Sequence, residues 1–525
     1  MNTKSGTSGH PKGLYVLFAT EMWERFNYYG MRAILIYFMT DALLYAKPFA
    51  SNLYGGYTGL SYLTPLVGGY IADRYWGNRH SIIIGGLFMA FAEFLLFGFA
   101  SYYQELQNNP DLSRLLFYTG LGIMIAGNGF FKPNISSMVG QLYPSQDKRL
   151  DPAYTIFYMG INVGGMLGPF ICGLVGNTGN PADFKWAFLA AGIGMLLSVI
   201  TFKYLKDKYI VSPEGKPVGI IPERMEGKKH FLKNPFSLQS LLFMLALSAV
   251  AVGLLYMHAD QIPSFMVGSV KVAFDISMLL LVAFIVILVL IFSDKSLTRI
   301  EVQRIIVIFI VSFFVVFFWS AFEQAGASLS FFANEQTDRY IPFLNFTVPP
   351  SWFQSLNSAF VVIFAPLFAG IWLFLGKRKM EPNSPAKMAI GLLLLALGFL
   401  VIAYGVKDPH KQKVNMMWLT SMYALHTWGE LCLSPIGLSL VNKLAPIRFA
   451  SLLMAVWFMA NAAANVLAGK LSALYPEPGQ TTHFLGYSMS SLYDFFMLFV
   501  VMAGVASVIL LLLTRWLGRW MHESK

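Results

Sequence analysis

Four ionisable side chains lie close together near the start of the chain, inside an apolar run that extends from about residue 13 to residue 40. They are Glu21, Glu24, Arg25 and Arg32. One charge at the centre of a membrane helix costs roughly 2.5–3.5 kcal/mol by insertion measurements, which give the lowest estimates of this cost. Lipid therefore cannot surround all four side chains. Glu24, Arg25, Tyr28 and Arg32 follow Glu21 at helical intervals, which places them along one stripe. Acids and bases arranged in this way predict a polar path through the protein.

Other apolar runs also carry polar residues. Lys132 lies in the middle of its run and would lose its proton unless a carboxylate paired with it, and Glu21 or Glu24 is the expected partner. Glu323 and Glu430 place carboxylates in the second half of the chain. Bases in one half and acids in the other predict a site for a zwitterion, because arginine holds a carboxylate bidentately and a carboxylate holds an ammonium group.

The amides expected to help hold the ammonium group are Asn162 and Asn357, and Tyr158 lies four positions before Asn162 on the same helical face. The aromatic side chains expected to line pockets between the two charges are Tyr28, Tyr29, Tyr62, Tyr158, Trp319 and Trp457. Ordinary helix packing is the alternative for any one of these aromatic residues. A further acid, Glu93, is expected to pair with a neighbouring polar group rather than to join a proton path.

Composition defines the class of protein that must position these residues. Of the 525 residues, 56% are hydrophobic and 12% are charged, about half the charged fraction of a soluble domain. Apolar runs of twenty residues or more recur, so we expect an all-α membrane protein. The net charge of +11 resides mostly in short loops beside apolar runs, which favours a role in topology over nucleic-acid binding. Cys172 and Cys432 lie within apolar runs and suggest neither a disulfide framework nor a metal site.

About fourteen transmembrane helices are expected, and the basic loops place both termini in the cytoplasm. The expected spans lie near residues 13–40, 49–73, 79–103, 114–140, 151–176, 184–206, 236–257, 270–293, 300–328, 350–376, 385–406, 414–441, 448–474 and 488–517. No metal cluster and no nucleophile with its base is found, so we do not expect an enzyme.

An internal repeat indicates the architecture. Residues 133–144 and 435–446 both read P-x3-S-x-V-x2-L-x-P, so the spans near 114–140 and 151–176 correspond to the spans near 414–441 and 448–474. Two parallel six-helix halves have this property. The predicted parts are an N-terminal bundle at 1–206, a linker with two inserted helices at 207–298, and a C-terminal bundle at 299–525. Chance similarity between apolar helices is the alternative, and the shared register of both prolines argues against it.

The end of the second span reads Asp73-Arg74-Tyr75-Trp76-Gly77-Asn78-Arg79. An acid and two arginines around a glycine turn resemble the loop between spans two and three of the major facilitator superfamily. We expect Asp73 and Arg74 to latch adjacent helix ends on the cytoplasmic side, with an ordinary solvated loop as the alternative.

The first stretch, Glu21-x-x-Glu24-Arg25-Phe26-x-Tyr28-Tyr29-Gly30, matches the ExxERFxYYG motif, and the whole chain resembles the proton-dependent oligopeptide transporter (POT/PTR) family. Phe131-Lys132-Pro133-Asn134, Gln354-Ser355-x-Asn357 and Gly429-Glu430-x-x-x-Ser434-Pro435 extend the resemblance. It implies the major facilitator fold with two inserted helices, as in bacterial members. It also implies import of di- and tripeptides with protons across the bacterial inner membrane by alternating access. Protons are the coupling ion, and no other cofactor is implied.

The resemblance also implies roles for single residues. The peptide carboxylate is assigned to Arg25, Arg32 and Lys132; the amino terminus to Asn162, Asn357 and Glu430; side-chain pockets to Tyr28, Tyr29, Tyr62, Trp319, Ser434 and Trp457. Proton coupling is assigned to Glu21, Glu24 and Glu323, with Arg25 and Lys132 as exchange partners. An outer gate is implied between Lys47 and Glu335. Mammalian members carry a histidine in the second span, where this chain reads Tyr54-Gly55-Gly56-Tyr57, so proton handling must depend on carboxylates.

One alternative stays open within the same family, namely transport of a non-peptide anion such as nitrate. Glu430 argues against it, because a carboxylate suits an ammonium group and repels a plain anion.

Overall fold

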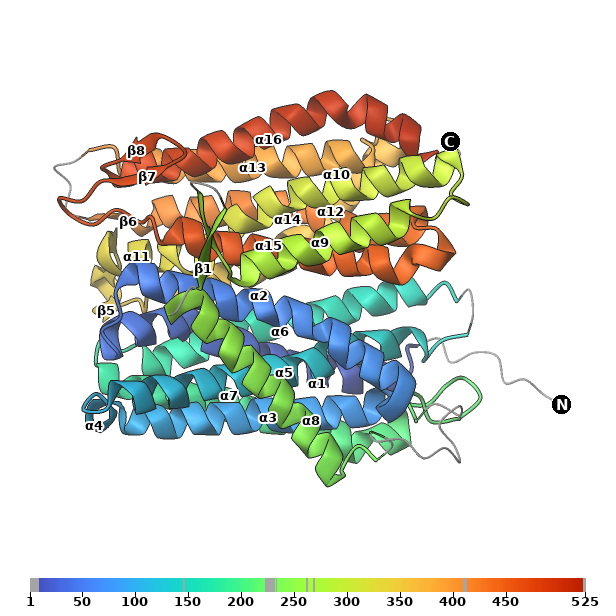
Figure 1. Cartoon of the computed structure of the whole chain (residues 1–525), viewed down its shortest axis with the longest axis horizontal. Helices are drawn as coiled ribbons and strands as arrows, with labels where there is room; N and C mark the ends of the chain where they lie inside the picture. Colours follow the sequence, from blue (N-terminus) through green and yellow to red (C-terminus); the bar gives the residue numbers. More distant parts are fainter. Residues whose placement is uncertain are drawn as a thin grey trace. The chain divides into compact units, whose positions relative to one another are not determined.

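The computed structural model describes residues 9–144, 147–221, 232, 234–260, 263–267, 270–408 and 413–522, without the side chains of 267, 270–272 and 434–439. Figure 1 shows the course of the chain. Within the described residues the long helices are α1 (Lys12–Tyr37), α2 (Lys47–Ile71), α3 (Gly77–Ser101), α5 (Pro110–Gly140), α6 (Leu150–Gly176), α7 (Phe184–Tyr209), α8 (Leu238–Leu255), α9 (Ile276–Phe292), α10 (Arg299–Phe322), α12 (Trp352–Lys377), α13 (Ser384–Gly405), α14 (Met416–Leu444), α15 (Ala450–Ser472) and α16 (Leu492–Met521).

These fourteen helices lie at the fourteen predicted positions, mostly within a few residues of the expected ends. Among the described residues, nine stretches are long and apolar enough to cross a membrane, with α2 and α3 counted as one stretch. The all-α membrane fold is therefore confirmed, and the number of crossings stays a prediction. The long helices α1, α5 and α14 are not among the nine, and they carry the predicted charges Glu21, Lys132 and Glu430.

Local sequence explains where several helices begin. Asn109 accepts a hydrogen bond from the backbone N–H of Leu112 at the start of α5, and Pro110 follows it as the first helical residue. Thr298 and Glu301 form a capping box at the start of α10. Such caps satisfy backbone N–H groups that the first turn of a helix leaves without partners.

Short elements connect the long helices. They include α4 (Tyr103–Leu106), α11 (Ser328–Glu335), a hairpin of β1 (Ser264–Val267) with β2 (Val270–Ala273), a hairpin of β4 (Tyr340–Ile341) with β5 (Phe346–Thr347), a hairpin of β7 (Thr482–Phe484) with β8 (Tyr487–Met489), and the parallel pair β3 (Thr337–Asp338) with β6 (Val414–Asn415). The predicted start of the span at 270–293 was wrong, because residues 270–273 pair as strand β2 and helix α9 begins at Ile276.

The chain divides into two compact units. The first comprises Met1–Ile34 and Thr64–Val252, and the second comprises Leu35–Leu63 and Gly253–Lys525. The predicted three-part division at 1–206, 207–298 and 299–525 stays a prediction.

In the first unit, α3 packs against α5 and α7, and α6 packs against α7. An apolar cluster at one end of α3 surrounds Trp76, whose indole N–H donates to the carbonyl of Leu232 at 2.9 Å. Ile84 and Phe130 belong to the same cluster, and the Trp76 and Phe130 rings lie 5.0 Å apart. The buried indole therefore has its N–H satisfied by the backbone of Leu232.

Small residues bring α6 against the helix that carries the charged stripe. A Cβ on Gly164 would lie 2.2 Å from the carbonyl oxygen of Met22, and one on Gly168 would lie 2.6 Å from that of Phe26. From the other side, a Cβ on Gly30 would lie 2.6 Å from Cys172 Sγ. Close backbone approach through small residues four apart is typical of helix packing in membranes. The glycine at the end of the ExxERFxYYG motif is thus a packing residue.

In the second unit, α13 packs against α14 and α16, α10 packs against α15 and α16, and α12 packs against α14. The inserted helix α9 packs against α15. The first part of α2 approaches α15 closely, because a Cβ on Gly55 would lie 2.8 Å from Gly469 Cα.

Candidate substrate and proton sites

Arg25 is held between two carboxylates of its own helix in the first unit. Its Nε donates to Glu21 Oε1 at 2.7 Å, and Glu24 Oε2 lies 3.2 Å from the same atom. Both glutamates are fully buried and Arg25 is almost so. The spacing of four residues predicted from the sequence produces the first contact directly.

Some carboxylate oxygens in this cluster lack a full hydrogen-bond donor within the described part of the chain. Among the described residues, Glu21 Oε2 and Glu24 Oε2 have no hydrogen-bond donor, and Glu24 Oε1 has only the long 3.5 Å contact with Asn128 Nδ2. Lys132 acts electrostatically on Glu24 from α5. Two buried carboxylates beside a cation can share a proton, because burial penalises each uncompensated negative charge.

Several predicted peptide-binding residues belong to the same unit. Arg32 is buried on α1, the rings of Tyr28 and Tyr29 meet edge to face at 5.5 Å, and Arg25 Cζ lies 5.9 Å from the Tyr29 ring. On α6, Asn162 donates its amide N–H to the carbonyl of Tyr158 at 2.9 Å. The structure places these residues, and their roles in binding stay predictions.

Glu93 on α3 is fully buried and accepts a hydrogen bond from Asn27 Nδ2 at 2.9 Å. Asn27 also donates to the carbonyl of Ala191 on α7 at 3.1 Å. The expected pairing of Glu93 with a neighbouring polar group is confirmed. Asn27 lies inside the ExxERFxYYG motif, so this amide ties the charged helix to α3 and α7.

In the second unit, Glu430 on α14 is buried and hydrogen-bonded to Asn357 on α12. Asn357 Nδ2 donates to Glu430 Oε2 at 2.8 Å and lies 3.1 Å from Thr427 Oγ1. The predicted pair of an amide and a carboxylate is therefore in direct contact. Thr427 was not predicted, although its position one turn before Glu430 could have indicated it.

The other predicted residues of the second unit are distributed over four helices. Glu323 is buried where α10 passes into a short 3₁₀ turn, one turn after Trp319. Trp457 is buried on α15, and Tyr62 is half-buried on α2. Ser434 lies on α14 within the stretch whose side chains are outside the described part.

Sequence reasoning missed Gln324, which is fully buried beside Glu323. Its amide donates to the carbonyls of Ser320 and Ala468, and its oxygen accepts from Ser328 Oγ at 2.5 Å. This amide joins α10 to α15 and α11 at the level of Glu323.

The predicted gate residues Lys47 and Glu335 are in contact, with Lys47 Nζ 2.7 Å from Glu335 Oε1. Lys47 also lies over the rings of Phe331 and Tyr475, at 5.6 and 5.2 Å from their centroids. Contact between the pair is confirmed, and its function as a gate stays a prediction.

At the other end of α2, Asp73 and Arg74 are exposed, and Arg74 stacks on the Tyr70 ring at 4.8 Å. Their latch role stays a prediction. The buried arginine of this loop is Arg79, whose Nη1 lies 2.5 Å from Asp207 Oδ1 on α7. The side chain of Arg79 also donates to the carbonyls of Val218 and Ile210, so it fixes the loop after α7 to the start of α3.

An ionic cluster in the second unit was not predicted at all. Asp275 caps α9 and accepts from Lys470 Nζ of α15 at 2.6 Å, while His258 Nδ1 lies 3.5 Å from the same carboxylate. His258 and Asp275 are both buried. Burial raises the pKa of Asp275, but the neighbouring His258 ring and the hydrogen bond from Lys470 outweigh it and hold this pKa well below its ordinary value. Within the second unit, the cluster joins the start of α9 and the turn at His258 to α15.

Buried charges within a many-helix membrane fold indicate a functional site inside a membrane protein. The family model described as POT family matches residues 79–487. The chain is 35% identical over 489 residues to the uncharacterized transporter YclF of Bacillus subtilis (strain 168), covering 92% of this chain and 91% of that protein. It is 30% identical over 480 residues to a di-/tripeptide transporter of Lactococcus lactis subsp. cremoris, covering 89% of this chain and 90% of that protein.

A solved structure of a peptide transporter POT in complex with sulfate aligns with a TM-score of 0.78 and 30% identity, covering 99% of this chain and 98% of that chain. The chain therefore belongs to the POT family, a family of multi-pass membrane transporters and not of enzymes, and has its major facilitator fold. The resemblance stated from the sequence is confirmed.

Proposed function

We propose that this chain imports di- and tripeptides together with protons across a bacterial inner membrane, with both termini in the cytoplasm and no cofactor other than the coupling proton. The observation that carries the proposal is the contrast between two buried clusters. Arg25 lies between Glu21 and Glu24 in one unit, and Glu430 lies against Asn357 in the other. A peptide is a zwitterion, and these clusters offer a cation for its carboxylate and a carboxylate for its ammonium group. The names of the relatives support this substrate class.

Proton coupling follows from which carboxylate is paired with the Arg25 guanidinium. While Glu21 and Glu24 are both ionised, Arg25 Nε lies within ion-pair distance of both carboxylates of its own helix. A proton on either carboxylate removes one of these charges and leaves the guanidinium available for the peptide carboxylate. Alternating access then exposes the loaded site to the other side of the membrane. Glu323 and Lys132 are proposed as further members of the coupling set.

The test is uptake of labelled di-alanine into proteoliposomes with and without an imposed inward pH gradient. We expect accumulation only with the gradient. Glu24→Gln should abolish accumulation while counterflow exchange continues, because exchange needs no net proton movement. Glu105→Gln, which alters an exposed acid on α4, is the matched control and should behave as the unaltered protein. Accumulation by Glu24→Gln equal to that of the control contradicts the coupling assignment.

The nitrate alternative predicts a different ligand profile. Thermal stabilisation of the purified protein by dipeptides but not by nitrate or free amino acids supports peptide transport. Stabilisation by nitrate alone would overturn it.

A further inference from the structure

A cleft that takes no part in the proposed transport cycle runs along the seam between α3 and α7, which lie side by side in the first unit (Figure 1). It encloses about 400 Å³. The two helices touch at its floor, because a Cβ on Gly86 would lie 2.5 Å from Val199 Cγ2. Its walls are apolar along most of their length and basic at one end.

The change from apolar to basic follows the helix axes. On α7, Leu196, Ile200, Lys203 and Lys206 line the cleft at helical spacing. Ten residues of helix rise about 15 Å, which is half of the roughly 30 Å hydrocarbon core of a bilayer. The lining of the cleft therefore spans one leaflet. Its basic end lies at the cytoplasmic surface of the membrane, the side on which the basic loops are predicted to lie.

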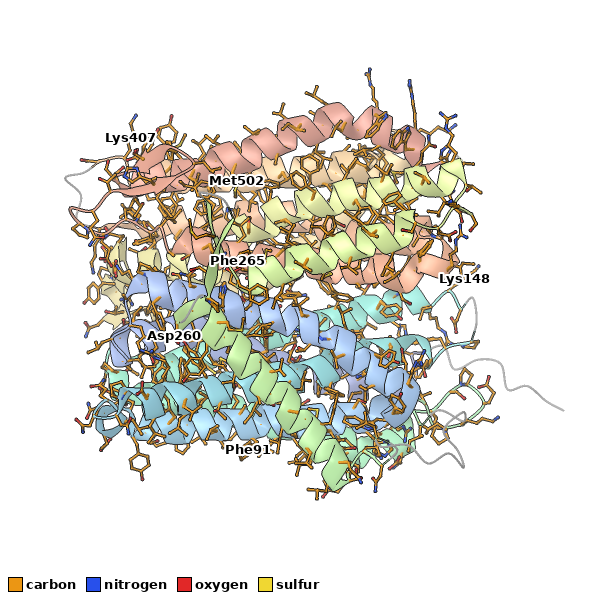
Figure 2. All side chains as sticks on the ribbon, in the orientation of Figure 1. Phe91, Lys148, Asp260, Phe265, Lys407 and Met502 are labelled. Carbon is orange, nitrogen blue, oxygen red and sulfur yellow. The ribbon has the colours of Figure 1, made fainter. Side chains whose placement is uncertain are left out.

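The wall formed by α3 has the same order. His80 lies at the basic end, followed by Ile83 and Leu87 one and two turns further. The apolar face continues to Phe91, which Figure 2 shows on the outer side of α3 and which is 60% exposed. Leu87 and Ile200 are 44% and 48% exposed, so the cleft opens toward lipid.

The basic end carries a surplus of positive charge. Lys206 Nζ donates to Asp207 Oδ2 at 2.7 Å, and Arg79 binds the other oxygen of the same carboxylate. Lys203 lies over the Tyr204 ring at 5.9 Å, and the ring of Phe236 covers His80 at 5.7 Å. One carboxylate thus serves two cations, and the charge of Lys203 is additional.

We propose that this cleft binds one anionic phospholipid of the cytoplasmic leaflet. Its phosphate lies at Lys203, Lys206 and His80, and one acyl chain lies against Ile83, Leu87 and Ile200. Positive charge at the surface and an apolar wall of one leaflet's depth match both parts of such a molecule. A soluble anion would make no contact with the apolar wall, and a lipid without net charge would not neutralise the lysines.

The test uses the full chain purified in mild detergent. Dioleoylphosphatidylglycerol, dioleoylphosphatidylethanolamine and inorganic phosphate are added separately, and retained lipid is counted by native mass spectrometry alongside the melting temperature. The double variant Lys203→Gln/Lys206→Gln should bind phosphatidylglycerol about 25-fold more weakly, since each lysine near an anionic headgroup contributes about fivefold. Lys208→Gln is the matched control, because this lysine lies on the same exposed end of α7, over Tyr209, and does not line the cleft.

A second variant tests the apolar wall without altering charge. Leu87→Trp fills the cleft from a lipid-facing position and should also reduce retention of phosphatidylglycerol. Three results would overturn the proposal. Lys208→Gln could lose as much phosphatidylglycerol as the double variant, or the unaltered protein could retain the two lipids equally. The third is that phosphatidylglycerol is still retained by both the double variant and Leu87→Trp. Stabilisation by inorganic phosphate to the same extent would show a simple anion site and would also overturn it. None of these measurements depends on peptide transport.

Discussion

Lys47 Nζ lies 2.7 Å from Glu335 Oε1 and 2.8 Å from Glu335 Oε2, so one ammonium group engages both oxygens of one carboxylate. The two residues are 288 positions apart, at the first turn of α2 and the last turn of α11. Close packing continues beside them, since Ser51 Oγ lies 3.2 Å from Ser472 Oγ and Tyr37 donates to the carbonyl of Ser330. The contact is established, and the function of Lys47 and Glu335 as an outer gate stays a prediction.

Glu335→Gln should favour opening of this gate. The side chains of Lys47 and Glu335 are 18% and 36% exposed, so solvent screens the pair and its loss should cost about 1 kcal/mol, or about fivefold in the population of the open state. The measurement is the rate at which an impermeant maleimide labels Ser51→Cys, with labelling of the native cysteines subtracted. The charge reversal Lys47→Glu/Glu335→Lys should restore slow labelling. A rate unchanged by Glu335→Gln would mean that the contact does not hold the gate.

Glu430→Gln should discriminate between peptides by their amino termini. A charge-assisted hydrogen bond contributes about 1.5–3 kcal/mol, so affinity for a dipeptide with a free amino terminus should fall roughly 10- to 100-fold. The N-acetylated dipeptide has no ammonium group and should lose little. Competition for uptake of labelled di-alanine measures both affinities. Equal losses for the two peptides would remove Glu430 from the ammonium site.

Asp275→Asn should destabilise the protein by about 1–3 kcal/mol, because it removes the carboxylate that Lys470 and His258 share. Since the pKa of Asp275 is lowered in the folded state, its stabilising contribution is complete above the pKa of the unfolded chain and is lost only as pH falls through the lower folded value. The stabilisation lost in Asp275→Asn should therefore still be present when the pH is lowered from 8 to 5.

Thermal unfolding of the unaltered protein and of Asp275→Asn at several pH values measures this stabilisation. Lys470→Gln should show a similar loss, and the double variant should lose less than the sum of the two single variants, because both remove one interaction. Additive losses would mean that Asp275 and Lys470 act separately.

The sequence predicted the features that depend on local pattern. Apolar runs located the fourteen long helices, and the spacing of four between Glu21 and Arg25 predicted their ion pair. Contacts between distant segments are a different matter. Asp275 and Lys470 are 195 positions apart, and neither residue has neighbours in sequence that indicate the other. Helical periodicity specifies a face of a helix but not its partner.

The resemblance to a known family supplied part of what pattern could not. It brought Lys47 and Glu335 together, and their contact is confirmed. It did not reveal why Gly30 belongs to the motif, because the reason is the proximity of Cys172 on another helix. It also did not distinguish the buried Arg79 from the exposed Arg74, since the two flank the same glycine turn and differ only in how they pack.

Gly164→Ala should lower both stability and transport. A Cβ at this position would lie 2.2 Å from the carbonyl oxygen of Met22 and 2.8 Å from Arg25 Cβ, so α6 must move away from the helix that carries the proton-coupling cluster. Overpacking of this kind costs about 1–3 kcal/mol. Gly98→Ala is the matched control, since a Cβ on this helical glycine of α3 would meet no atom within 4 Å, and alanine there gains up to about 1 kcal/mol of helix propensity. Melting temperature and di-alanine uptake should both fall for Gly164→Ala, and neither should fall for Gly98→Ala. Equal behaviour of the two variants would show that the close contact between α1 and α6 is not required.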